Sequence, residues 1–356
     1  MDPREREVLE RIEQRRRRPR RKLLEDRVTT SHGAGGKASR DMTEALFFPA
    51  LGNDLLAPLD DAAVFDAGGV RLAMSTDAFV VKPLTFPGGD IGELAVNGTV
   101  NDLAVSGARP IALSAAFVVE EGLPIEDLGR YAASMGRAAE AAGVPIATGD
   151  TKVVERGKAD GLYVCTTGVG LVERELTPAS IRPGDRVLVS GTIGDHGMAI
   201  LVARGDLALE VDLASDTAPL YGLCRTLLTG VAGVRCLRDP TRGGLATTLV
   251  ELAQSADVSI GLDERALPVR PEVAGACEIL GLDALYVANE GKLVAVVDPA
   301  EADAALAALR GHPLGTDAAI IGEVTAEPPG MVLLETALGG SRVVDMLAGD
   351  PLPRIC

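Results

Sequence analysis

The 356-residue sequence has no tryptophan, and aromatic residues make up only 3% of it. Without large aromatic side chains, the core must be packed from Ala, Val and Leu, and the 41 glycines indicate many tight turns. Both features are typical of an α/β enzyme, and the length predicts two domains. The sequence contains no apolar run near the roughly 20 residues that span a bilayer and no recognisable signal peptide. We therefore expect a cytoplasmic protein with no membrane partner.

Cysteines are few, and they are not grouped. The five show no CxxC pair and no spacing typical of zinc ligands. An odd number in a reducing compartment predicts free thiols, of which four are expected in the core. The fifth, Cys356, ends the chain after Pro351 and Pro353, which favour an extended backbone. We predict that residues 342–356 are a mobile tail, with nothing packed after Asp345, that carries this sulfur into a pocket; a frayed terminus is the alternative.

Positive charge is also scarce, since the net charge is −16. This excludes nucleic acid as the main partner, because phosphate backbones need a basic surface. Residues 1–27 are the exception, with eleven Lys or Arg and seven Asp or Glu. We interpret this segment as a basic leader, partly helical and otherwise disordered. An arm that binds RNA is the alternative.

A Walker A motif is absent, but a different glycine-rich stretch follows the leader. Residues 31–37 read SHGAGGK and include Gly33, Gly35, Gly36 and Lys37. Small residues let backbone N–H groups approach phosphate oxygens, and the lysine adds a positive charge. A flexible hinge explains the stretch equally well when it is taken alone.

Aspartates recur among apolar neighbours in the first half of the chain. Asp61, Asp77 and Asp102 each follow or interrupt an apolar run. Burying a carboxylate is costly unless a positive charge compensates it. A helix cap or a turn explains any one of them, but the set favours a shared Mg²⁺ that also contacts a polyphosphate.

Two further motifs place charged residues next to predicted strands. Asp150 and Lys152 follow the predicted strand 144–148, where α/β sheets tend to bind ligands, although a salt-bridged turn is an alternative. Asp239 lies in RDPTRGG, directly before a predicted helix whose N-terminus suits phosphate or metal. His196, in GTIGDHG, is either catalytic or a turn-capping residue.

Hydrophobic periodicity divides the chain into two α/β domains, residues 28–172 and 173–341. The clearest element is an amphipathic helix over 125–142 that ends at Gly143. The other predicted helices span 198–203, 245–255 and 300–309. The predicted strands span 111–119, 144–148, 163–172, 186–190, 234–237, 293–297, 319–324 and 331–334.

The order of these motifs points to a family. HGAGGK, DDAAV, STDAF, FPGGDIG, NGTVNDLA, TGDTKV, GTIGDHG, RDPTRGG, ANEGK and a terminal PRIC resemble the HypE family of hydrogenase maturation proteins. That family belongs to the ATP-using superfamily of aminoimidazole ribonucleotide synthetase, selenophosphate synthetase and thiamine-monophosphate kinase. The resemblance covers residues from about 30 to 356. It implies a two-domain PurM-like fold of the α/β (α+β) class, with an N-terminal domain that forms a homodimer through its sheet.

The resemblance also implies an activity. A HypF-type carbamoyltransferase would load a carbamoyl group onto Cys356, and ATP-dependent dehydration would convert it to a thiocyanate. The cyanide would pass to the iron on a HypC–HypD scaffold during [NiFe]-hydrogenase assembly. An ATP-dependent small-molecule kinase or synthetase of the same superfamily, and a nucleotide-sensing carrier without catalysis, are the alternatives.

The implied site draws on most of these motifs. Glu290, in ANEGK, is expected to be the base, and Lys152 is expected to orient the carbamoyl group. The glycine-rich stretch would cover the ATP phosphates, near Asp77 and Asn101. Mg²⁺ would be held by Asp61, Asp102, Asp150 and Asp239.

Overall fold

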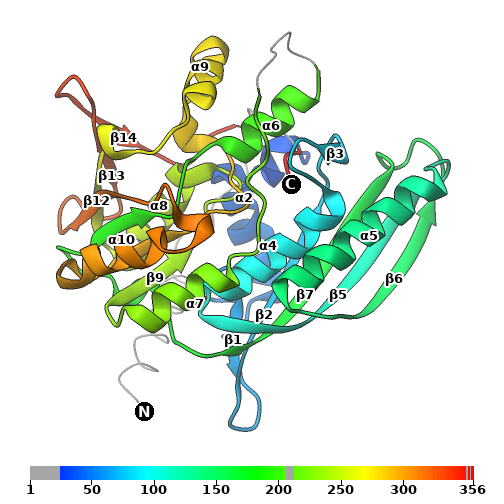
Figure 1. Cartoon of the computed structure of the whole chain (residues 1–356), viewed down its shortest axis with the longest axis horizontal. Helices are drawn as coiled ribbons and strands as arrows, with labels where there is room; N and C mark the ends of the chain where they lie inside the picture. The colour runs from blue at the N-terminus through cyan, green and yellow to red at the C-terminus, as the bar shows by residue number, and fades with distance from the viewer. Residues whose placement is uncertain (1–24, 206–211, 350–351, 353) are drawn as a thin grey trace.

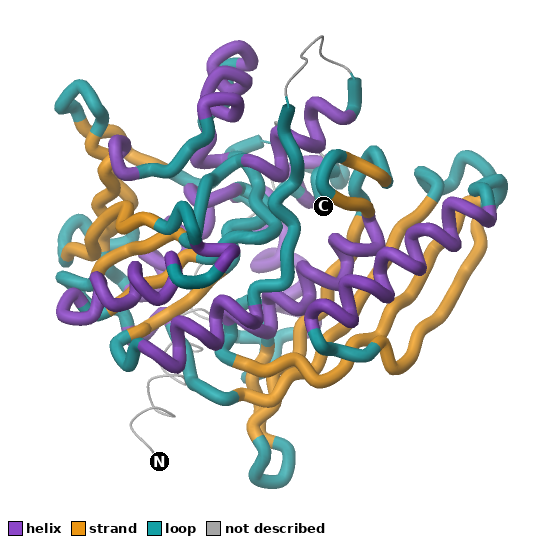
Figure 2. Tube along the Cα trace, in the orientation of Figure 1, coloured by secondary structure: helices purple, strands orange, loops and turns teal. Residues whose placement is uncertain are grey.

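The computed structural model describes residues 25–205, 212–349, 352 and 354–356. Residues 1–24 of the predicted leader, together with Pro351 and Pro353, lie outside the described residues. The described chain forms two units, each built on one β-sheet, that pack side by side (Figure 1). Loops gather between the two sheets, beside the chain end (Figure 2).

The first unit is a five-stranded sheet with two helices on one face. The helices are α4 (Ile91–Val105) and α5 (Ile125–Ala142), and both pack on the central strands. A short hairpin, β3 (Thr85–Phe86) and β4 (Gly89–Asp90), precedes α4. The strand order is β1-β2-β7-β5-β6 and only the β5–β6 pair is parallel. The strands are β1 (Ala63–Asp66), β2 (Arg71–Phe79), β5 (Ala108–Glu120), β6 (Ile146–Val154) and β7 (Leu162–Val172).

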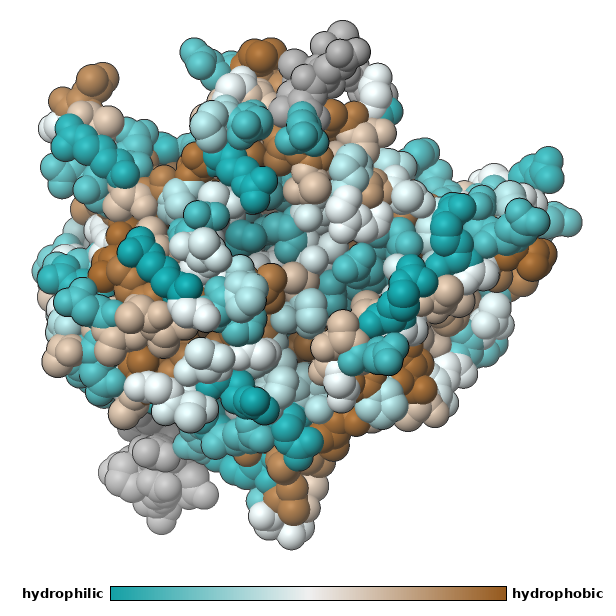
Figure 3. All heavy atoms as spheres, viewed as in Figure 1, coloured by the Kyte–Doolittle hydropathy of each residue, from teal (hydrophilic) through white to brown (hydrophobic). Residues whose placement is uncertain are grey.

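The two helices of this unit form for different reasons. The Asp90 side chain caps α4 by accepting hydrogen bonds from the N–H groups of Gly92 and Glu93. Helix α4 is apolar almost all round, because it lies between its own sheet and the second unit. Helix α5 is amphipathic and turns a hydrophilic face outward (Figure 3). It ends at Gly143 in the left-handed conformation, which confirms the predicted helix and its stop.

The second unit is a seven-stranded sheet covered on both faces. Alternate side chains on β8 divide between the faces, so that Leu188 packs with one set of helices and Val187 and Val189 with the other. Helices α7 (Tyr221–Gly230) and α10 (Ala302–Arg310) cover the first face, and α8 (Gly244–Ala256) covers the second. The strands, in sheet order, are β14 (Ser341–Val344), β13 (Val332–Glu335), β10 (Ser259–Asp263), β12 (Ala319–Thr325), β8 (Arg186–Val189), β11 (Val294–Val297) and β9 (Val234–Arg238).

Three further segments join the units. Helices α6 (Asp195–Ala203) and α9 (Pro271–Leu280) leave the second sheet and contribute side chains to the core of the first unit. The N-terminal segment lies against the second unit, where Arg40 donates a hydrogen bond to Gln254 at 2.6 Å. That segment contains η1 (Thr30–Gly33), α2 (Lys37–Met42), η2 (Thr43–Phe47) and α3 (Phe48–Leu51). Short 3₁₀ turns complete the chain: η3 (Pro178–Ser180), η4 (Glu264–Ala266), η5 (Ala284–Tyr286), η6 (Pro299–Glu301) and η7 (Pro313–Gly315).

The structure corrects three expectations about the chain. Residues 149–152 do not follow a strand but lie inside β6, because pairing with β5 extends that strand to Val154. The predicted tail began at residue 342, but Ser341–Val344 form β14, the edge strand beside β13. The expectation that nothing packs after Asp345 is wrong, since the end of the chain is buried: Met346, Leu352, Ile355 and Cys356. Within the described ranges, no helix is both long and apolar enough to cross a membrane.

Replacing Leu188 tests the core of the second unit. Leu188 is fully buried against α7 and α10, so Leu188→Ala removes apolar contacts and leaves a cavity. We expect a loss of about 2–5 kcal/mol in the free energy of unfolding. Leu338→Ala is the control, because Leu338 is 99% exposed and should change it little. Urea unfolding followed by circular dichroism measures both, and equal losses would contradict the assigned packing.

Candidate active site around the docked chain end

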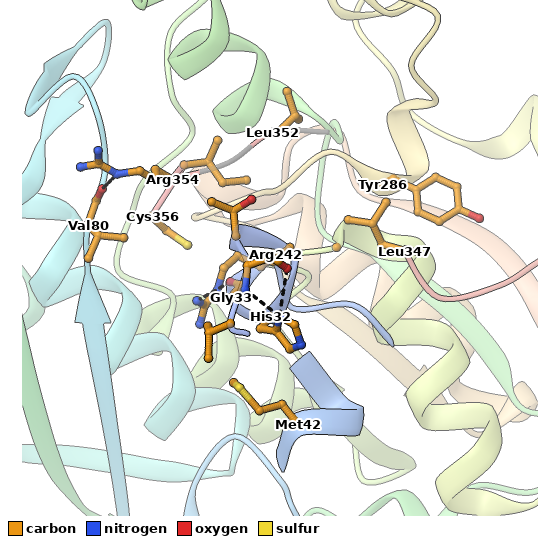
Figure 4. Close-up of a pocket in the computed structure, with 16 residues that line it drawn as sticks. His32, Gly33, Met42, Val80, Arg242, Tyr286, Leu347, Leu352, Arg354 and Cys356 are labelled. Carbon is orange, nitrogen blue, oxygen red and sulfur yellow. Dashed lines mark hydrogen bonds between the residues drawn. The ribbon is translucent and has the colours of Figure 1, made fainter. Parts of the chain in front are cut away.

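The end of the chain lines a pocket between the two units. The cavity has a volume of about 320 Å³, and its walls come from the N-terminal segment, the loop at Arg242–Gly243 and the last residues (Figure 4). Cys356 is only 8% exposed, and its Sγ points into the pocket. A thiol at the chain terminus is therefore held inside a cavity lined by the glycine-rich stretch.

Two charged side chains lie beside the thiol. The S–H group of Cys356 hydrogen-bonds to the carboxylate of Glu290. Arg242 faces the same sulfur, and this contact is the main reason that its own pKa is raised. Burial raises the pKa of the Cys356 thiol to about 12, because the effect of Arg242 is smaller than the cost of desolvating a thiolate. The docked thiol is therefore neutral at physiological pH.

Glu290 is placed by the loop that carries ANEGK. Its backbone N–H donates to Asp216 Oδ1 at 3.0 Å, and its side chain is almost completely buried. Gly291 has to follow, because a Cβ there would lie 1.8 Å from the carbonyl oxygen of Asp216. Burial, with Asp239 and Asp216 nearby, raises the pKa of Glu290 well above its usual value. The carboxyl group thus has an increased proton affinity next to the sulfur.

Four of the predicted aspartates form a cluster at this site, from both units. Asp61, Asp77 and Asp102 come from the first unit and Asp239 from the second. Burial raises the pKa of each one, and the charges of the other three raise that of Asp102 further. The structure brings these four predicted site residues together, and their role in holding Mg²⁺ stays a prediction. Their mutual repulsion is the kind of field that a bound cation relieves.

Neighbouring side chains hold the aspartates in place. Ser75 donates to Asp102 Oδ2 at 2.5 Å, and Thr99 donates to Asp77 Oδ2 at 2.8 Å. The Arg238 guanidinium is ion-paired with Asp61 and Asp60. Nowhere in the described ranges do three His, Cys, Asp or Glu side chains converge closely enough to hold a metal by themselves. The all-oxygen donor set fits Mg²⁺ bound jointly by carboxylates and phosphate, which is the usual arrangement for this ion.

Asn101 has a different role from the predicted contact with ATP. Its Nδ2 donates to the carbonyl oxygens of Ala218 and Glu290, each at 3.1 Å. Its Oδ1 accepts from the N–H of Leu220 at 2.8 Å. Because both amide protons are used and the side chain is buried, Asn101 ties α4 to the second unit and does not face a nucleotide.

The structure does not bring Asp150 and Lys152 to the cluster. Both are exposed on β6, the edge strand of the first sheet, and their side chains pair with each other at 2.5 Å. That ion pair and the Thr151 N–H lower the pKa of Asp150, whereas burial raises the pKa values of the clustered aspartates. Within this chain the two side chains form an ion pair, as the alternative of a salt-bridged turn expected, but they lie in a strand and not in a turn.

The glycine-rich stretch lies at the mouth of the pocket and packs closely against two neighbours. A Cβ at Gly35 would lie 2.5 Å from the Cβ of Arg242, and one at Gly36 would lie 2.3 Å from the carbonyl oxygen of Leu347. Gly33 has open space around it and lines the pocket, while the Lys37 side chain is exposed. The stretch therefore contacts the loop of Arg242 and the start of the tail.

Sequence reasoning missed three charged residues of the site. Arg242 lies in the quoted motif RDPTRGG, and a second arginine three residues after an aspartate was a signal that could have been used. Arg238 opens the same motif and its charge offsets that of Asp61. Asp216, which accepts from Glu290, lies in a stretch with no motif and gave no signal.

The acidity of Cys356 can be tested by alkylation. With a pKa of about 12, the docked thiol should react slowly with iodoacetamide, and its rate should still rise above pH 10. An undocked cysteine, with a pKa near 8.5, would instead reach a plateau at about pH 9.5. The rate is read from the mass of the C-terminal peptide. A plateau below pH 10 in the intact protein would contradict the buried position of the thiol.

Known proteins match this chain over nearly its whole length. The AIR synthase related protein family matches with its N-terminal domain over residues 59–172 and its C-terminal domain over residues 182–334. The carbamoyl dehydratase HypE of Rhodobacter capsulatus is 55% identical over 94% of this chain and 99% of its own length. A HypE structure in complex with ATP is 48% identical, with a TM-score of 0.78 over 93% of this chain and all of that one. HypE in a HypE–HypF complex is 46% identical, with a TM-score of 0.82 over 86% and 99%. The predicted two-domain PurM-like fold is confirmed, and the chain belongs to the HypE family of carbamoyl dehydratases.

Proposed function

We propose that the protein is an ATP-dependent dehydratase that converts an S-carbamoyl group on its own Cys356 into a thiocyanate. The observation that carries this proposal is the docked terminal thiol, hydrogen-bonded to Glu290 and facing Arg242 beside four clustered aspartates. A thiol in this position serves as a carrier, since its raised pKa makes it a poor nucleophile. The bonds that form and break in the reaction are then those of the carbamoyl group attached to it.

The reaction removes one oxygen and two protons from the carbamoyl group. The carbonyl oxygen attacks the γ-phosphorus of ATP, ADP leaves, and the nitrogen loses its first proton. The C–O bond then breaks, phosphate leaves with the oxygen, and loss of the second N–H proton completes the C≡N bond. Phosphorylation is needed because oxygen alone is a poor leaving group. The protein therefore contributes positioning, charge and a base.

Glu290 is the group best placed to take those protons. Glu290 hydrogen-bonds to the sulfur that would carry the carbamoyl group. Its carboxylate therefore lies close to the position of the carbamoyl nitrogen. Its raised pKa makes it a stronger base than an exposed glutamate. Arg242 faces the same sulfur and supplies the positive charge that stabilises the oxygen as negative charge builds up there.

The four clustered aspartates would bind Mg²⁺ with the ATP phosphates. Bound Mg²⁺ would neutralise charge on the phosphates and orient them for transfer. Asp61, Asp77, Asp102 and Asp239 supply hard oxygen ligands, and their repulsion favours a cation between them. Gly33 and Ala34 line the same pocket, and the stretch would cover the phosphates once the N–H groups of Gly35 and Lys37 leave Ser39 Oγ and the carbonyl oxygen of Leu347.

Two partners follow from the chemistry of the tail. A HypF-type carbamoyltransferase would load Cys356, in keeping with the solved HypE–HypF complex of a relative. A HypC–HypD scaffold would then receive the cyanide for the iron of [NiFe]-hydrogenase. Both transfers need access to a sulfur that is buried when docked, so the tail has to leave the pocket. We place these steps in the cytoplasm.

We further propose a homodimer formed through the first sheet. The face of that sheet opposite α4 and α5 exposes the apolar side chains of Met74 and Ile111, and its edge strand β6 exposes Ile146 and Val153. A second copy would cover this face and the unpaired edge of β6. Asp150 and Lys152 would then lie at the interface, where Lys152 could orient the carbamoyl group in the partner's pocket and Asp150 could join its metal site.

Glu290→Gln tests the base. The amide keeps the size of the side chain but cannot accept the N–H proton, so we expect dehydration to fall by at least about a hundredfold. Carbamoyl loading and ATP binding should persist. Single-turnover conversion of carbamoylated protein, followed by intact mass, measures the rate. Glu272→Gln, on an exposed glutamate at the start of α9, is the matched control. Dehydration at the normal rate in Glu290→Gln would remove Glu290 from this role.

Asp102→Asn tests the metal cluster. Loss of one carboxylate should weaken Mg²⁺-ATP binding by about tenfold or more in calorimetry. Because burial and three neighbouring carboxylates raise the pKa of Asp102, its ionised form costs folding free energy at neutral pH. The ligand-free variant should therefore melt at the same or a higher temperature. Asp303→Asn, on the exposed start of α10, is the control. Unchanged affinity for Mg²⁺-ATP would rule Asp102 out as a ligand.

The function as a whole is tested by intact mass. The protein is incubated with a HypF-type transferase, carbamoyl phosphate and either ATP or a non-hydrolysable analogue. We expect a carbamoyl adduct at Cys356 in both cases and its conversion to a cyano group only with ATP. A chain ending at Ile355 should show neither. ATP consumption on an added small molecule, with no adduct at Cys356, would identify a kinase or synthetase instead.

A further inference from the structure

The last three residues are bound mainly through their backbone. The N–H of Val80 donates to the carbonyl oxygen of Cys356, and the N–H of Lys82 donates to that of Arg354, both at 3.1 Å. These bonds pair the chain end antiparallel to the segment after β2. Backbone pairing of this kind fixes the register of a bound strand. It therefore sets how far the sulfur reaches into the pocket.

The carbonyl oxygen between them, that of Ile355, is met by a side chain. His196, in the first turn of α6, places Nε2 at 2.7 Å from this oxygen and Nδ1 at 2.8 Å from Ser215 Oγ. A carbonyl oxygen can only accept, so Nε2 carries the proton and Nδ1 accepts from the Ser215 hydroxyl. Ser215 Oγ accepts in turn from the N–H of Thr217 at 3.1 Å. The imidazole is thus held in one tautomer and donates only to the tail.

His196 is completely buried, and the edge of Phe86 packs on it with ring centroids 5.7 Å apart. It neither caps the turn nor contacts the sulfur, so neither role left open by its motif applies. Both ring nitrogens are engaged, one with Ser215 and one with the tail. If the tail left the pocket, the buried N–H would lose its partner, which costs free energy.

The other side chains that hold the tail lie nearer the surface. Arg204, at the end of the same helix, donates to the carbonyl oxygen of Arg354 at 2.9 Å. The guanidinium of Arg354 pairs with Asp160, and both side chains are more than a quarter exposed. Exposed ion pairs contribute little. Among the described hydrogen bonds between side chains and the tail backbone, the bond from His196 is the one made in full burial.

We propose that His196 is a positioning residue that latches the docked tail through the Ile355 carbonyl oxygen and so holds Cys356 beside Glu290. This inference rests on the proposed function for its consequence, because a latched tail brings the carbamoyl group to the base. Dehydration requires the latched state, whereas loading and transfer require the released one. The strength of this hydrogen bond therefore contributes, with the backbone bonds from Val80 and Lys82, to the fraction of time that the tail spends docked.

His196→Leu and His196→Gln test the latch. Leucine has no donor, whereas the Nε2 of glutamine can occupy the place of the imidazole Nε2. We expect iodoacetamide to label Cys356 about tenfold faster in the leucine variant, which is the value of one buried hydrogen bond, and close to the wild-type rate in the glutamine variant. Dehydration at saturating ATP should slow in parallel with unchanged KM for ATP. His312→Leu is the matched control, since the His312 side chain accepts a hydrogen bond from the N–H of Leu314 in η7, after α10.

A cycle with the tail deleted separates latching from a general structural role. His196→Leu is introduced into the full chain and into a chain lacking residues 350–356, and thermal unfolding is measured for all four proteins. We expect the substitution to lower the unfolding temperature more in the full chain, because only there does His196 have the Ile355 carbonyl oxygen as its partner. Equal losses, or unchanged labelling of Cys356, would overturn the proposal. Failure of the wild-type protein to dehydrate a carbamoyl group would reject the proposed function and leave the labelling result intact.

Discussion

The site depends on the repulsion between buried carboxylates at the junction of the two units. Asp102 and Asp239 are both strongly affected, since burial and neighbouring aspartates raise the pKa of each well above its usual value. The pKa of Glu290 is raised as well, by burial and by the negative charges of Asp239 and Asp216. Two arginines, Arg238 and Arg242, offset part of this charge. The arrangement costs folding free energy and prepares the site for a cation.

Neither unit could build this site alone. The first supplies Asp61, Asp77 and Asp102 from its sheet and from α4, and the second supplies Asp239 and Glu290 from loops at the edge of its sheet. Asn101 connects them, because its amide bonds to the backbone of Glu290 and to that of Ala218 and Leu220, just before α7. Helix α4 is almost completely buried because it lies at this junction, between the two units. Its two faces serve two different cores.

Much of the fold and half of the site could be predicted from the sequence, where local patterns carry the information. The helix 125–142 has one apolar face and a glycine stop, and the clustered aspartates interrupt apolar runs, so both are visible without coordinates. Asn101 was assigned to the nucleotide site, but its side chain binds backbone groups of the second unit. The sequence around a polar residue in a buried helix does not distinguish between these two roles. Asp150 and Lys152 were expected at a strand end, but pairing with β5 extends β6 through them. The docking of the tail depends on contacts with Val80 and His196, far away in sequence, which no local pattern reveals.

The burial of the last residue also limits how the chain can be lengthened. The terminal carbonyl of Cys356 accepts a hydrogen bond from the N–H of Val80, and the thiol points into the pocket. Any residue added after Cys356 would have to extend from a buried residue whose carbonyl oxygen is already bonded to Val80, or else keep the tail outside. The N-terminal segment, by contrast, is exposed at Val28. An affinity tag therefore belongs at the beginning of this protein, and one placed at its end would abolish the docked state while leaving both sheets folded.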